Sequence, residues 1–233
     1  MDHVKTDFEA HSGPQTQSNQ RPVKVWDLPT RVFHWGLVVL IAVAWISAEA
    51  GQSVFWVHVY SGSAVLGFIA FRLVWGVMGS CYARFDNFVH GPEKVMDYAK
   101  KLFAFRPPHH VGHNPLGGWM VVALISSIMV IALTGLMTSE DGFVGPLAHI
   151  GSGWLGEGHE AIGSILIALI IVHVAGVLVH GVISRENLPR AMVSGIKHVP
   201  ADEKAEDIKP IGLIRPVLAV GAGIAVATYF LWI

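Results

Sequence analysis

The chain has 233 residues, of which 52% are hydrophobic and only 14% are charged. Its mean hydropathy is positive. These proportions exclude an ordinary soluble domain and indicate an integral membrane protein. A formal net charge of -1 argues against nucleic acid as a partner, and a single cysteine, Cys81, excludes a disulfide framework and a Cys-x-x-Cys-His haem attachment.

The first segment, residues 1–25, is rich in Gln, Ser, Asn and Pro. It has neither an early apolar run nor a small-residue cleavage site, so it is not a signal peptide. Its composition predicts a flexible tail.

Five later stretches are long and apolar enough to cross a hydrocarbon core of about 30 Å. A very short loop separates the first two, which predicts an antiparallel hairpin. The spans are expected at 32–50, 54–79, 115–138, 158–183 and 212–232.

The predicted organisation therefore has four parts. They are a cytoplasmic tail over 1–25, a four-helix transmembrane domain over 26–198, a charged linker over 199–210 and an additional transmembrane helix over 211–233.

Positive charge is distributed very unevenly between the connections. With a cytoplasmic N-terminus, all sixteen Lys and Arg residues fall on the cytoplasmic side or near its interface. The connection around Glu49 and the one over 139–157 contain none. This positive-inside bias predicts a cytoplasmic N-terminus. Between the second and third spans, 93–105 is expected to form an amphipathic helix on the anionic inner leaflet.

Four histidines match in helix face and in depth. His159 and His173 are fourteen residues apart, so they share a face about 21 Å apart along the helix. His58 and His159 both begin spans on the outer side. His34 lies roughly 22 Å below the outer end of its span, close to the depth of His173. The pairs His34–His173 and His58–His159 therefore suit two stacked haems.

Each histidine also has a simpler interpretation. One near an interface is often an incidental polar residue, whereas an ionisable side chain as deep as His173 usually has a partner. His180 is a rival inner ligand, but it would lie about 10 Å deeper, and it could belong to a quinone or proton site. The histidines placed in tails or connections receive no role: His3, His11, His90, His109, His110, His113, His149 and His198.

Three glycines lie close to the predicted ligands. Gly62 and Gly163 each follow an outer histidine by four residues, and Gly176 follows His173 by three. They would let a porphyrin lie flat against the helix face. Glycines also allow close helix packing, which is the alternative interpretation.

Two arginines could neutralise a haem propionate. Arg72 lies fourteen residues after His58, at the depth of the inner haem, where a guanidinium could pair with a propionate. Alternatively, its side chain could snorkel to the inner headgroups. Arg31, just before the first span, has the same two interpretations.

Three segments carry a family resemblance: VWDLPTRVFHWG, HVYSGSAVLGFIAFRLVWGVMGSCYARF and GHEAIGSILIALIIVHVAGVLVH. They resemble the prokaryotic cytochrome b-561 family, which includes the b-type cytochrome subunits of membrane-bound nickel–iron hydrogenases. The similarity covers roughly 23–198, and ENLPRAMVSGIK resembles the segment that closes the four-helix core. The tail and the fifth span lie outside it.

The resemblance implies an all-α integral membrane protein whose four-helix bundle encloses two non-covalent haems b. Carried onto this chain, the bis-histidine ligands are His34, His58, His159 and His173. The implied function is electron transfer across the bacterial cytoplasmic (inner) membrane, between the quinone pool and a periplasmic cytochrome c or a dehydrogenase such as a hydrogenase. The chain would then be the cytochrome b subunit of a respiratory oxidoreductase.

Two other functions are compatible with the same residues. The first is a stand-alone quinone-linked oxidoreductase that reacts with a small molecule such as superoxide at the outer haem. The second is a zinc or copper transporter, although metal sites need ligands that converge on one point. His180, Arg72 and Trp75 are candidates for a quinone site by position alone.

Overall fold

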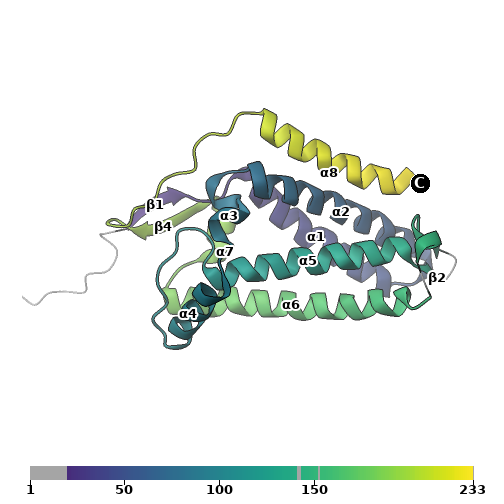
Figure 1. Cartoon of the computed structure of the whole chain (residues 1–233), viewed down its shortest axis with the longest axis horizontal. Helices are drawn as coiled ribbons and strands as arrows, with labels where there is room; N and C mark the ends of the chain where they lie inside the picture. Colours follow the sequence, from purple (N-terminus) through teal and green to yellow (C-terminus); the bar gives the residue numbers. More distant parts are fainter. Residues whose placement is uncertain (1–19, 141–142, 152, 233) are drawn as a thin grey trace, which may run out of the picture.

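The computed structural model describes residues 20–140, 143–151 and 153–232, and five long helices dominate it (Figure 1). All five are long and apolar enough to cross a membrane. This confirms the predicted all-α integral membrane fold. The helices are α1 (Leu28–Glu49), α2 (Phe55–Met78), α5 (Pro115–Met137), α6 (Leu155–Ser184) and α8 (Ile214–Trp232).

Local sequence signals set where several helices begin. The Asp27 side chain accepts a 2.6 Å hydrogen bond from the Thr30 N–H and caps α1, and Asn114 caps α5 in the same way. Both helices have proline in the first turn, where its missing N–H costs nothing. Between α1 and α2 the chain turns at Gly51, whose φ of +89° suits glycine, and passes through the short helix η1 (Gln52–Val54). The predicted hairpin is thus formed.

Helix α2 is the centre of the bundle, because α1, α5 and α8 all pack against it, while α6 packs mainly on α5. The contact with α8 is very close. A Cβ at Gly67 would lie 2.6 Å from the Gly223 carbonyl oxygen, and one at Gly223 would lie 2.7 Å from the Gly67 oxygen. Ala219 and Ala227 continue the small-residue face of α8. Small residues therefore join the fifth helix to the bundle.

An apolar layer fills the middle of the bundle. It consists of buried residues from α2, α5 and α6, with partly buried residues of α1 packed against them. By their positions in sequence, its α2 members fall between His58 and Arg72, and its α6 member falls between His159 and His173. The two histidine levels are therefore separated by hydrocarbon. The buried members are Val65, Ile69, Ile125, Ile128 and Leu166.

One end of the bundle, here called the basic end, carries most of the short elements: η2 (Cys81–Ala83), α3 (Phe85–Phe88), α4 (Pro92–Phe103) and α7 (Leu188–Ser194). Helix α4 matches the amphipathic helix expected over 93–105. It buries Val95 and Tyr98, while Lys94, Lys100 and Lys101 are exposed.

The basic end also holds a two-stranded antiparallel ladder. Strand β1 (Gln20–Lys24) pairs with β4 (Ile196–Pro200), and Val23, Val25 and Val199 are fully buried there. Within the segment expected over 1–25 to be a flexible tail, backbone pairing and apolar burial order residues 20–25. Residues 1–19 lie outside the described residues. Strand β4 likewise includes the first two residues of the linker expected over 199–210.

The opposite end of the bundle is simpler. It carries the ladder of β2 (Ser139–Glu140) with β3 (Phe143–Val144) and the short helix η3 (Ala148–Ile150).

Candidate functional site

Two of the predicted ligands meet at the opposite end of the bundle. His58 is in the first turn of α2 and His159 is in the second turn of α6. Their ring centroids are 6.0 Å apart, and their planes are nearly perpendicular, at 82°. A metal with two imidazole nitrogens at about 2 Å each would space the ring centroids roughly 6 Å apart. The separation therefore fits one iron between the two rings.

Backbone carbonyls orient both of these rings. His58 Nδ1 is 2.8 Å from the Ala44 carbonyl oxygen, and His159 Nδ1 is 2.9 Å from that of Ile131. A carbonyl oxygen can only accept, so each Nδ1 carries the proton and donates. Each Nε2 then keeps its lone pair for a metal. This is the usual way in which a protein fixes the tautomer of a ligating histidine.

Helix α5 adds contacts that the sequence did not indicate. Thr134 Oγ1 lies 3.2 Å from His159 Nδ1, and a Cβ at Gly135 would lie only 2.9 Å from His159 Cε1. Phe55 stacks on His58, with centroids 5.5 Å apart and planes 20° from parallel. No spacing rule along one helix could have found Thr134 or Gly135, because the ring they contact belongs to another helix.

The other two predicted ligands lie toward the basic end, in the second turn of α1 and the second half of α6. His34 is close enough to His173 for their charges to interact. His34 Nδ1 is buried and has no hydrogen-bond partner among the described residues. Trp35 lies beside the His34 ring in an edge contact, with centroids 5.0 Å apart. This pair therefore lacks the backbone orientation of the first pair.

Arg72 is buried in the protein, which rules out snorkelling. Only 3% of the residue is exposed, and its Nη1 has no hydrogen-bond partner among the described residues. Its guanidinium carbon lies 4.7 Å from the ring centroid of Phe85, with Phe33 and Phe88 within 6 Å. Aromatic faces offset part of the cost of burying this cation. These rings leave the Arg72 Nη1 donor without an acceptor, which an anion could supply.

His113 has a place here that the sequence analysis did not give it. It lies just before α5, with its ring centroid 4.7 Å from that of Trp26 and 4.5 Å from that of Phe88. Its Nδ1 is buried without a partner among the described residues. Burial, and then the charge of Arg72, lowers the pKa of His113 to about 3. In sequence it resembles the other connection histidines, and only the folded loop brings it to Arg72.

Trp75, a candidate for a quinone site, and Arg31, a candidate for pairing with a propionate, both make structural contacts. Trp75 is only 1% exposed, and its Nε1 donates to Asp27 Oδ2 at 3.2 Å. Arg31 Nη1 donates to the Val193 carbonyl oxygen at 2.5 Å, which ties α1 to α7. These contacts engage the only polar atom of the Trp75 side chain, whereas Arg31 keeps a buried Nε that has no hydrogen-bond partner among the described residues.

His180 faces the surface helix α4. The Tyr98 hydroxyl is 3.3 Å from His180 Nδ1, and Ser184 Oγ is 3.2 Å from His180 Nε2. Both ring nitrogens therefore have side-chain partners of their own.

The three predicted glycines have different surroundings. A Cβ at Gly62 or at Gly176 would meet nothing within 4 Å. One at Gly163 would lie 3.3 Å from Ile131 Cδ1, so this glycine lets α5 approach α6. Gly62 and Gly176 leave space beside the histidines, as a flat cofactor needs. For Gly163 the structure favours the packing interpretation.

The paired imidazoles, the unpartnered Arg72 donor and the open glycine faces together fit haem. Comparison with known proteins points the same way: the model for a family described as prokaryotic cytochrome b561 matches residues 25–195. No curated protein and no solved structure matches the chain. The matched region contains all four predicted histidine ligands and covers most of the sequence, so the chain belongs to the prokaryotic cytochrome b561 family.

Proposed function

We propose that the chain carries electrons across the membrane by way of two b-type haems, one held by His58 and His159 and the other by His34 and His173. Membership of the prokaryotic cytochrome b561 family implies b-type haem and transmembrane electron transfer. The number of haems, their ligands and the redox partners are our proposal.

The observation that carries the proposal is the geometry of His58 and His159. Their rings are 6.0 Å apart, and both Nδ1 atoms donate to backbone carbonyls. His58 and His159 would hold the iron of a haem between them, and an iron bound by two imidazoles would supply one-electron transfer rather than oxygen chemistry. The same carbonyls make the rings more electron-rich, which favours the oxidised iron.

The second site rests on the burial of charge around His34 and His173. Arg72 and His113 each present an unpartnered buried nitrogen near this pair. Burial and the charge of Arg72 lower the pKa of His113 to about 3, so His113 is neutral. Arg72 is a buried cation with no ion pair among the described residues, which is costly. A propionate of the haem would supply an anion and accept hydrogen bonds from both. Arg72 and His113 would thereby fix the orientation of the porphyrin.

The spacing of the two sites suits transfer across the bilayer. His159 and His173 are about 21 Å apart along α6, and the apolar layer lies between their levels. That layer lowers the local dielectric and excludes water from the path. It thereby keeps the oxidised haems from being stabilised by bulk water, which is one means by which a protein tunes a potential.

The positions of the charges suggest the direction in which the chain faces. Every described Lys and Arg lies at the basic end or within a few turns of it, and the positive-inside rule places that end in the cytoplasm. The His58–His159 site would then exchange electrons with a periplasmic cytochrome c or dehydrogenase. The quinone pool would be the partner within the membrane.

The test is a reduced-minus-oxidised optical spectrum with haem quantitation on the purified full chain. Two low-spin haems b per chain are expected for the wild type. The variants His58→Ala and His159→Ala should each lose the same haem, because both remove a ligand from one iron. Loss of different haems, or a wild-type protein that contains a single haem, would contradict the paired assignment.

A further inference from the structure

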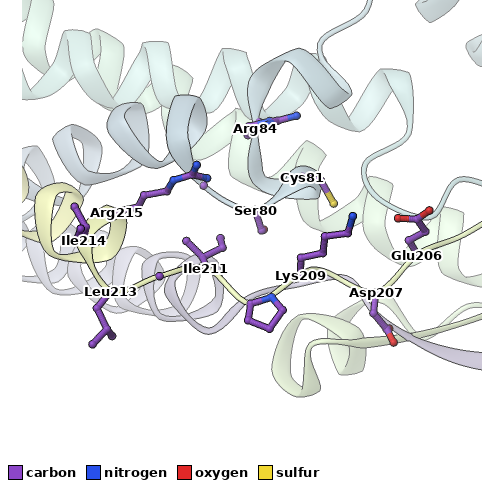
Figure 2. A pocket seen from close by; sticks show the side chains of 13 residues that line it. Ser80, Cys81, Arg84, Glu206, Asp207, Lys209, Ile211, Leu213, Ile214 and Arg215 are labelled. Carbon is purple, nitrogen blue, oxygen red and sulfur yellow. The ribbon is translucent and has the colours of Figure 1, made fainter.

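A pocket at the basic end lies apart from the histidine pairs (Figure 2). It has a volume of about 690 Å³ and is formed by two stretches of chain, residues 79–84 after α2 and residues 206–215, which end in the first turn of α8. The second stretch lies beyond the region that matches the family, which ends at residue 195. One wall of the pocket is therefore formed by the linker and the start of α8, outside the matched region.

Three cationic side chains line the pocket: Arg84, Lys209 and Arg215. In Figure 2, Lys209 and Arg215 extend from the second stretch toward the chain that carries Ser80, Cys81 and Arg84. Within the part of the chain that the structure describes, neither Lys209 nor Arg215 forms an ion pair. Arg84 pairs with Asp86 at 3.2 Å, but this contact is exposed and therefore weak.

Two carboxylates also line the pocket, so its charge has to be counted. Asp207 is already engaged, because its Oδ1 accepts a 2.6 Å hydrogen bond from the Lys24 N–H. Glu206 lies at one side of the pocket (Figure 2). With Asp86, which already pairs with Arg84, three carboxylates balance the three cations, but Lys209 and Arg215 have no ion pair among the described residues. Most of the positive charge is not neutralised by direct contacts, so the pocket suits an anion.

The apolar part of the lining shows where the pocket lies relative to lipid. Leu213 is 82% exposed and Ile214 is 75% exposed, and both stand where α8 begins. A helix that enters the hydrocarbon core exposes such side chains to acyl chains. The cations beside them are then at the level of the phospholipid headgroups, where basic pockets between helices bind anionic lipids.

We propose that this pocket binds the phosphate of an anionic phospholipid, with the acyl chains against the start of α8. Arg and Lys pair strongly with phosphate oxygens, whereas a neutral ring such as a quinone would gain little from three cations. The bound lipid would link the end of α2 to the start of α8. The proposal does not depend on the haem assignment.

The experiment measures lipid retained by the full chain. The haem-loaded protein is reconstituted in phosphatidylcholine vesicles that contain a minor fraction of phosphatidylglycerol, extracted in mild detergent and examined by native mass spectrometry. The wild type should retain phosphatidylglycerol in preference to phosphatidylcholine. The triple variant Arg84→Gln/Lys209→Gln/Arg215→Gln should retain it at least about tenfold less, since it loses the charge-assisted contacts with the phosphate.

A matched variant controls for general attraction to a negative surface. Lys94→Gln/Lys100→Gln/Lys101→Gln removes the same charge from α4, at the same end, and should keep the retained lipid. If the triple pocket variant does not fold, Lys209→Gln alone, in the linker, should still weaken retention. Equal retention of both lipids by the wild type, or equal loss in the pocket and α4 variants, would overturn the proposal.

A further arm separates lipid from free phosphate. Inorganic phosphate is added to the wild type at the concentration of the phosphatidylglycerol. A lipid site should keep its lipid, because the acyl chains hold the headgroup in place. Displacement of the lipid would show a site for free phosphate and overturn the lipid assignment.

Discussion

The two histidine pairs are held in different ways, although all four side chains lie on long apolar helices. At the opposite end, the backbone itself orients His58 and His159 through the carbonyls of Ala44 and Ile131. At the basic end, His34 Nδ1 has no partner among the described residues, and the neighbouring Arg72 is surrounded by aromatic rings. The first pair is preorganised for a metal. The second is a buried polar space that a charged cofactor would complete.

The largest expected effect comes from removing a ligand of the less organised pair. His173→Ala should reduce the haem content to about half, because one of the two proposed haems would lose a ligand that packing cannot replace. His180→Ala, seven residues along the same helix, is the matched control and should keep both haems. Haem quantitation beside the optical spectrum measures this. If His180→Ala lost haem while His173→Ala kept its full haem content, the ligand would be His180 and not His173.

The next largest expected effect comes from removing the buried charge of Arg72. Arg72→Gln should lower the midpoint potential of one haem by roughly 60 mV, the one-electron equivalent of about 1.4 kcal/mol, because a nearby cation favours the reduced iron. Arg72→Lys should restore most of the shift if charge alone matters, and less if the guanidinium fork binds a propionate. Potentiometric titration followed optically separates the haems. An equal shift of both potentials would argue against a local role for Arg72.

Two glycines distinguish cofactor space from helix packing. Gly62→Ala should weaken haem binding at the His58–His159 site about tenfold, because its methyl would fill space beside the porphyrin. The haem-free protein should be unharmed or slightly more stable, since alanine favours a helix. Gly163→Ala, which meets Ile131 at 3.3 Å, should instead lower stability with or without haem. Haem titration and thermal unfolding of both forms measure the difference, and identical behaviour of the two variants would contradict it.

The smallest expected effect concerns the His58–His159 pair. Thr134→Val removes the hydroxyl near His159 Nδ1 but leaves the Ile131 carbonyl as acceptor. The loss should be worth about 1 kcal/mol at most, or roughly 40 mV for one electron. The direction is upward, because a ring that donates less is a poorer electron donor to iron. A shift well above this size, measured by the same titration, would make Thr134 the main orienting group.

Sequence reasoning could nominate most residues of the candidate site because the signals for them lie along single helices. The fourteen-residue spacing of His159 and His173 sets their face and separation, and the start of α2 sets the level of His58. Gly135 and Thr134 escaped because they act on a ring that belongs to another helix. His113 escaped because a loop histidine gains meaning only when folding buries it, here against Trp26 and Phe88.

The sequence by itself determined the membrane class, the five spans and the depths of the four histidines, since apolar length and helical rise are local properties. Tertiary structure decided what lies between the helices. It placed α8 against α2 through Gly67 and Gly223, buried Arg72 among aromatic rings, and ordered residues 20–24 against β4. The physical reason is that these contacts join residues far apart in the chain, and side-chain shape and burial select them rather than periodicity.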